Sequence, residues 1–166
     1  MAEPVIRPRQ NDDLPSCVRV LAAVHRAGGY PAVWPDEPER WLTPRELIGG
    51  WVAVDGPAVL GHVALTRAKP GLAAAAGLPA EQLASVARLF VDVSARRAGL
   101  AGALLDRAVQ AAAEGGRRPV LEVASDAAGA IALYERAGWR HLGTAAGGWL
   151  TTAGQPAVVH TYLGPV

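Results

Sequence analysis

The feature that most constrains the fold is a strand–helix–strand unit in the second half of the chain. Residues 85–93 alternate between two sets of side chains, which predicts a β-strand. Residues 99–114 carry apolar side chains at helical spacing and stop at a pair of glycines, and residues 120–124 are again strand-like. A helix between two strands is typical of a right-handed crossover that joins parallel strands. The sequence therefore predicts an α/β protein with at least one parallel strand pair.

The flanking segments predict a mixed sheet. The patterns indicate further strands at 4–9, 51–54, 59–66, 139–147 and 157–163. Helices are expected after Asp12 or Asp13, ending at Gly28-Gly29, and from Asp126 to Ala137. Residues 30–45 hold four prolines, two tryptophans and a tyrosine, which favours an ordered loop or short helices. The Gly- and Ala-rich segment 68–82 is interpreted as a long connection.

Length and composition exclude several classes of protein. A chain of 166 residues with 51% hydrophobic and 19% charged residues suits one globular domain, 1–166. The net charge of +1 gives no electrostatic argument for nucleic-acid or membrane binding. No apolar run reaches the roughly 20 residues of a membrane span, and the N-terminus has no signal pattern, so a cytoplasmic location is expected. Cys17 is the only cysteine and the four histidines lack ligand spacing, so no metal site is expected.

The turn before the helix at 99–114 has the composition of an anion site. It reads Arg96-Arg97-Ala98-Gly99-Leu100-Ala101-Gly102. A helix N-terminus offers free backbone N–H groups, glycines let a ligand approach the backbone, and arginines bond phosphate oxygens. A glycine-containing turn with surface arginines is the competing interpretation. The spacing R-x-x-G-x-A fits neither a Walker loop nor a dinucleotide-binding fingerprint.

Two blocks of the sequence resemble one known family, the GCN5-related N-acetyltransferases. Arg96, Gly99 and Ala101 match its phosphate-loop signature Q/R-x-x-G-x-G/A. Residues 130–139, AIALYERAGW, resemble the family segment A-I-x-L-Y-x-x-x-G-F/W, in the family's order and spacing. The close resemblance covers about residues 85–145.

The resemblance implies a fold and a co-substrate. The fold would be a mixed sheet of about six or seven strands flanked by about four helices. Two parallel strands would splay apart to admit acetyl-coenzyme A. Its pantetheine would lie along one of these strands and its pyrophosphate on the following loop. The implied cofactor-binding residues are Phe90, Val91, Asp92, Val93, Arg96, Arg97, Ala98, Gly99, Leu100, Ala101 and Gly102.

The resemblance also implies a direct attack of an amine on the thioester, without a covalent enzyme intermediate. Tyr134 would protonate the departing thiolate, although a core aromatic is the alternative for that residue. Glu122 is the best candidate for the base, because related enzymes place a base in an L-E-V strand; the alternatives are a solvent-facing Glu122, Glu81 or an ordered water. Tyr30, Trp34 and Trp41 are expected either in the core or along the acceptor pocket.

Three residues depart from the family pattern. Arg88 stands where an acidic residue is common, Ala127 replaces an asparagine, and Ala101 replaces the commoner glycine. The expected function is acetyl transfer from acetyl-coenzyme A to a primary amine, either a small molecule or a peptide N-terminus. The alternative is a catalytically degenerate acyl-coenzyme A sensor. A homodimer is expected from family habit alone.

Overall fold

The computed structural model describes residues 3–96 and 98–165. Its residues cluster into two compact units. The first unit contains the chain up to Thr66 together with Val86–Gln110, and the second contains Arg67–Ser85 together with the chain from Ala111 onward.

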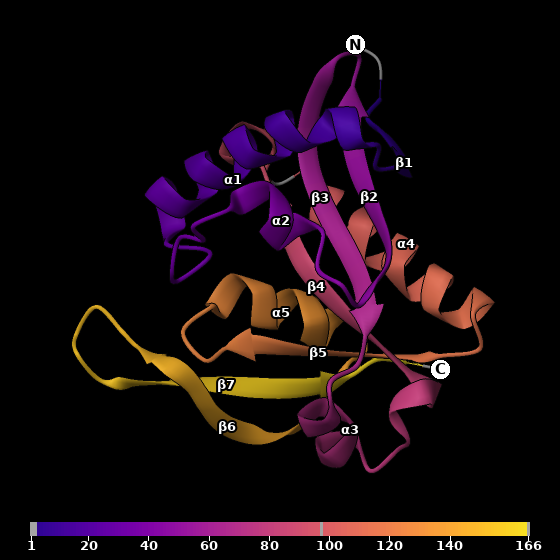
Figure 1. Cartoon of the computed structure of the whole chain (residues 1–166), viewed down its shortest axis with the longest axis vertical. Coiled ribbons are helices and arrows are strands. Elements are labelled where there is room, and N and C mark those ends of the chain that lie inside the picture. The colour runs from indigo at the N-terminus through magenta and orange to yellow at the C-terminus, as the bar shows by residue number, and fades with distance from the viewer. Residues whose placement is uncertain (1–2, 97, 166) are drawn as a thin grey trace. The chain divides into compact units, whose positions relative to one another are not determined.

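The described residues form a seven-stranded mixed sheet in the order β1-β2-β3-β4-β5-β7-β6 (Figure 1). The β4–β5 pair is parallel, whereas the β1–β2, β2–β3, β5–β7 and β6–β7 pairs are antiparallel. The predicted mixed sheet and parallel crossover are therefore confirmed. The strands are β1 (Val5–Pro8), β2 (Leu47–Asp55), β3 (Ala58–Arg67), β4 (Leu83–Val91), β5 (Arg118–Ala124), β6 (Arg140–Leu150) and β7 (Pro156–Leu163).

Five α-helices lie in the described part of the chain, where about four were expected. They are α1 (Leu14–Gly28), α2 (Pro38–Leu42), α3 (Pro70–Ala76), α4 (Leu100–Glu114) and α5 (Ala128–Arg136). The additional helix is α3, which lies within segment 68–82, where the sequence had indicated only a long connection. Pro70 occupies the first helical position, where a missing N–H costs nothing, and Gly77 ends the helix at φ +67°. In this part of the chain no helix is long and apolar enough to cross a membrane.

Two expected helix caps differ in the structure. Asp13 is the N-cap residue of α1, but its carboxylate makes no capping bond to that helix. It accepts instead from the Gln10 backbone N–H, at 2.7 Å, and from Arg7. Helix α5 has Ala127 as its N-cap, so the expectation that Asp126 caps it was wrong.

The core of the first unit forms where α1 and α2 pack on β2, β3 and β4. Gly61 in β3 allows a close approach, because a Cβ at this position would lie 2.9 Å from the Leu104 side chain of α4 and 3.1 Å from the Phe90 carbonyl. The buried residues of the cluster are Leu14, Cys17, Val20, Leu21, Val24, Leu42, Val52, Val59 and Phe90. Trp34 and Trp41 pack against this cluster, as one of the two sequence interpretations expected.

The second unit places different helices on the two faces of the β5–β7 pair. Leu72 of α3 packs with Val120 and Leu163. Tyr134 of α5 packs against the ring of Tyr162, the residue before Leu163 in β7. Successive side chains of a strand point to opposite faces, so α3 and α5 cover opposite faces, as drawn in Figure 1.

Strand β4 departs from regular geometry in two ways. Arg88 has φ +55°, a left-handed conformation that breaks the simple alternation expected along residues 85–93. The parallel register with β5 runs from Leu83↔Arg118 to Ser85↔Val120, although both strands continue.

Candidate active site

The loop between β4 and α4 has the geometry of an anion site within the first unit. Gly99 adopts φ +78°, and a Cβ built there would meet no atom within 4 Å. Helix α4 begins at Leu100, and the Ala103 N–H bonds the Gly99 carbonyl at 3.1 Å. The backbone N–H groups before Ala103 at the helix start have no carbonyl acceptor within the helix, so they can donate to an anion. These residues fit the pyrophosphate of coenzyme A.

The side chains of this loop are largely open to solvent. Arg96, Ala98 and Gly99 are exposed, Ala101 and Gly102 are half-buried, and Leu100 is buried. Arg97, the remaining predicted loop residue, lies outside the described residues. The buried Leu100 anchors the helix start while the backbone before it stays accessible.

The residues predicted to flank the pantetheine lie at the end of β4. Phe90 is buried and stacks on His62, and Val91 is the last strand residue. The Asp92 N–H bonds the Leu60 carbonyl at 2.7 Å, and its carboxylate accepts from the Ser94 N–H at 3.3 Å. Val93 begins a short 3-10 turn, Val93–Ala95, instead of continuing the strand. Backbone groups available for strand-like pairing are therefore nearer Val91 than Val93.

Glu122 lines a cavity of about 340 Å³ in the second unit. It is exposed, and its register partner in β7 is Thr161, which lines the same cavity. The other lining residues come from α3 and β6: Gly71, Leu72, Ala75, Leu142, Gly143, Thr144 and Ala145. The sequence pattern did not identify Thr161, although the alternation of strand 157–163 puts it on the Glu122 face.

Tyr134 is buried in α5, with 7% of its surface exposed. Its ring contacts Trp139 at a centroid distance of 5.8 Å and Tyr162 at 6.2 Å. The Tyr162 hydroxyl donates to Glu135 Oε2 at 3.4 Å, and burial together with this carboxylate raises the pKa of Tyr162. Glu81, the alternative base, is exposed in the 3-10 turn Ala80–Gln82, and it does not line the Glu122 cavity.

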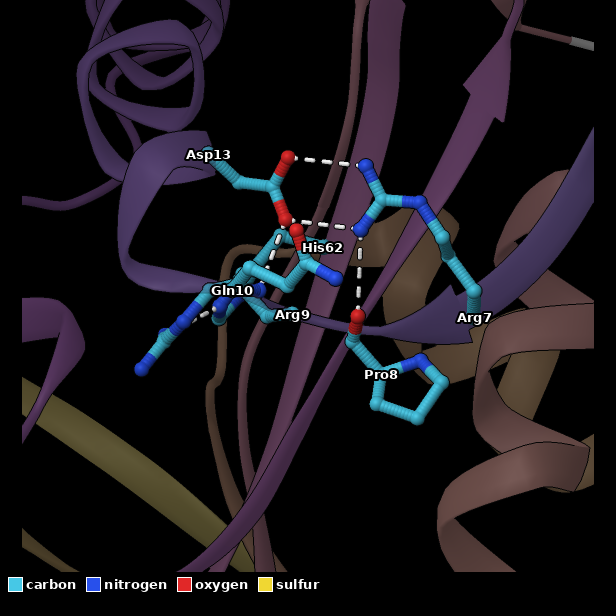
Figure 2. A network of polar contacts seen from close by, with 6 residues as sticks. All are labelled: Arg7, Pro8, Arg9, Gln10, Asp13 and His62. Atoms are coloured by element: carbon cyan, nitrogen blue, oxygen red, sulfur yellow. Dashed lines mark hydrogen bonds and ion pairs between the residues drawn. The ribbon is translucent and has the colours of Figure 1, made fainter.

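A buried polar network lies in the first unit (Figure 2). Arg9 Nη1 donates to His62 Nε2 at 2.8 Å. On the other side of the ring, His62 Nδ1 bonds the Arg88 carbonyl at 2.8 Å. Burial lowers the pKa of His62 to about 4, so the ring is neutral and one nitrogen can accept while the other donates. The two Nη atoms of Arg7 donate to the two carboxylate oxygens of Asp13, each at 2.8 Å. This bidentate bond lowers the pKa of the Asp13 carboxyl.

Comparison with known proteins identifies the family. The sequence model described as Acetyltransferase (GNAT) family matches residues 18–139. The chain belongs to the acetyltransferase (GNAT) family. This confirms the resemblance in the sequence, and enzymes of this family take the acetyl group from acetyl-coenzyme A. No curated protein sequence is similar enough to count as a match.

Solved structures of similar fold match 96–98% of the chain. An N-acetyltransferase from Staphylococcus aureus Mu50 is 23% identical, with 98% of both chains covered and a TM-score of 0.75. NAA60 from Arabidopsis thaliana in complex with acetyl-CoA is 22% identical, covering 96% of this chain and 97% of that chain, with a TM-score of 0.76. The ribosomal-protein-S18-alanine N-acetyltransferase from Escherichia coli is 18% identical, covering 98% and 96%, with a TM-score of 0.72. At these identities the likeness concerns the fold.

The described residues hold no group of three or more metal-ligating side chains. Ion pairs join Arg7 to Asp13 and Arg40 to Glu37.

Proposed function

We propose that the chain is a single acetyltransferase domain that moves an acetyl group from acetyl-coenzyme A to a primary amine. The family match over residues 18–139 carries this proposal, because it spans both the β4–α4 loop and the segment that contains Tyr134. Acetyl-coenzyme A supplies a thioester-activated acetyl group. The free N–H groups at the start of α4 bind its pyrophosphate, and the end of β4 near Val91 positions its pantetheine.

Glu122 is the proposed base. Its carboxylate opens into the cavity between α3, β6 and β7, and the second unit offers no other carboxylate in that cavity among its described residues. An alkyl amine is mostly protonated near neutral pH and must lose a proton before it attacks. Glu122 accepts that proton as the new N–C bond forms.

Tyr134 is the proposed acid. As the C–S bond breaks, the electron pair stays on sulfur, and the Tyr134 hydroxyl donates a proton to the thiolate. The surrounding rings of Trp139 and Tyr162 hold the phenol in one place and keep water away from it.

The experiment that tests the function combines binding with turnover. Acetyl-coenzyme A is titrated calorimetrically into the protein, and free thiol release is then followed with a library of amines. Micromolar binding with amine-dependent thiol release is expected. A folded protein that does not bind acetyl-coenzyme A overturns the proposal.

A coenzyme A sensor is the second candidate. Ala127 at the start of α5 favours it, because the family often carries a cofactor-contacting asparagine there. A sensor would bind acetyl-coenzyme A with similar affinity and release no thiol with any amine in the library.

A further inference from the structure

Two arginines reach the same end of helix α2 in the first unit. Arg88 Nε donates to the Trp41 carbonyl at 3.2 Å, and Arg9 Nη1 donates to the Leu42 carbonyl at 2.8 Å. Trp41 and Leu42 are consecutive, so two cationic groups converge on one short stretch of backbone. Both arginines are half-buried.

Neither of these arginines forms an ion pair within the described residues. The charge of Asp13 acts on Arg9 from a distance and only partly offsets the effect of burial on its pKa, and both carboxylate oxygens of Asp13 are already bonded to Arg7. Burial lowers the pKa of Arg9 and of Arg88, which means that their charged forms are disfavoured where they lie. A half-buried pair of cations without an anion is costly unless an anion binds there.

The guanidinium of Arg88 is held in the form that recognises a carboxylate. Its Cζ lies 3.9 Å from the centroid of the Trp41 ring, and the edge of Tyr30 approaches that ring with centroids 6.2 Å apart. Stacking and the Nε bond fix the plane of the group, and no hydrogen bond to its two Nη atoms is made by the described residues. Two parallel N–H donors in a fixed plane match the two oxygens of a carboxylate.

We propose that the acceptor is a small amine that carries a carboxylate, an α-amino acid or a close analogue, and that Arg88 binds this carboxylate. This inference rests on the proposed acetyl transfer. Arg88 lies three residues before Val91 in β4, so its side chain starts close to the strand end that is proposed to position the pantetheine. Trp41 and Tyr30 provide apolar surface beside the charge. A peptide N-terminus, whose amine is followed by a neutral amide, lacks the group that Arg88 would bind.

The test compares amino acids with the amines that decarboxylation would give. The pairs are phenylalanine with 2-phenylethylamine, histidine with histamine, and tryptophan with tryptamine, with phenylalanine amide as a neutral peptide-like control. We expect kcat/KM to be at least about 30-fold higher for the carboxylate member of at least one pair, as for loss of a charge-assisted bond. Equal values within every pair, or preference for phenylalanine amide, overturn the inference while the acetyl-transfer function stands.

Substitution of Arg88 assigns the discrimination to this residue. In Arg88→Gln the preference for the carboxylate should fall to within about threefold, mainly through KM, while the affinity for acetyl-coenzyme A is unchanged. Arg107→Gln is the matched control, because Arg107 also lies over a tryptophan of the first unit, 5.1 Å from the Trp51 centroid. It should retain the full preference. An equal loss of activity towards both members of a pair in Arg88→Gln would indicate a structural role and overturn the inference.

A binding measurement tests the inference without turnover. Phenylalanine and 2-phenylethylamine are titrated separately into the protein saturated with coenzyme A. Phenylalanine should bind at least about tenfold more tightly to the wild type and lose that advantage in Arg88→Gln. No difference between the two ligands, including no binding of either, overturns the inference.

Discussion

Glu122 and Tyr134 lie on opposite faces of the β5–β7 strand pair. Glu122 pairs in register with Thr161 and shares a cavity with it, whereas Tyr134 packs on Tyr162, the next residue along β7. Acetyl transfer from a thioester needs a base at the attacking nitrogen and an acid at the departing sulfur, two different atoms bonded to one carbon. Separate residues are proposed for these two tasks, so each can be tested by its own substitution.

Tyr134→Phe removes the proposed acid and keeps the ring. We expect kcat to fall about 100-fold, because the thiolate must leave without a proton, while the dissociation constant of acetyl-coenzyme A stays within about twofold. Steady-state kinetics and calorimetry measure the two quantities. Tyr162→Phe is the matched control, since Tyr162 is equally buried and touches the same ring, and its kcat should change less than threefold. A parallel loss of affinity and rate in Tyr134→Phe would contradict the acid role.

Glu122→Gln tests the proposed base. The amide keeps the shape of the side chain but cannot accept the proton from the amine, so kcat should fall by about 100-fold. Its exposure predicts little change in the free energy of unfolding. Glu81→Gln is the control, because Glu81 is also an exposed carboxylate of the second unit, and it should leave kcat unchanged. Activity lost in Glu81→Gln but kept in Glu122→Gln would exchange the two assignments.

Gly99→Asp tests the anion site at the start of α4. A carboxylate there repels the pyrophosphate, and we expect acetyl-coenzyme A to bind at least about tenfold more weakly. Because Gly99 has φ +78°, any side chain also strains the backbone. Gly116→Asp provides the control, since Gly116 has φ +69° and a Cβ built there would meet no atom within 4 Å, but it lies beyond the other end of α4. Equal effects of the two substitutions on acetyl-coenzyme A affinity would show that strain, not phosphate binding, explains the result.

The sequence predicted the elements whose patterns are local. The strand–helix–strand unit expected at 85–124, strand β7 and the glycine-ended helix α1 follow from periodicity and from glycine at helix ends. Helix α3 was missed because glycine, proline and alanine in 68–82 indicate a loop when they are counted together. Pro70 at the first helical position and Gly77 after the last are a start and a stop signal, and they could have identified it.

Only the parts of the site that lie within one short stretch of sequence could be predicted. The R-x-x-G-x-A loop and Tyr134 belong to short motifs, whereas the Glu122 cavity is made by α3, β6 and β7, which are far apart in the sequence. Likewise, Arg9, His62 and Arg88 are brought together by strand pairing and by the left-handed residue in β4. Hydrophobic periodicity and short motifs describe neighbouring residues in the sequence, so they do not show which distant residues come into contact.

His62 predicts how the stability of the protein depends on pH. Its pKa is about 4 in the folded protein and near its ordinary value of 6.5 when unfolded, so the unfolded state binds the extra proton between these values. Stability should therefore fall as the pH decreases from 7.0 to 4.5, by about 2 kcal/mol from this group. Asp13 contributes in the same direction, but mainly below its ordinary pKa of 3.8. Urea unfolding at the two pH values measures the change, and His62→Gln, which does not titrate, should lose most of it. The same pH dependence in both proteins would mean that His62 is not the group that destabilises the fold in mild acid.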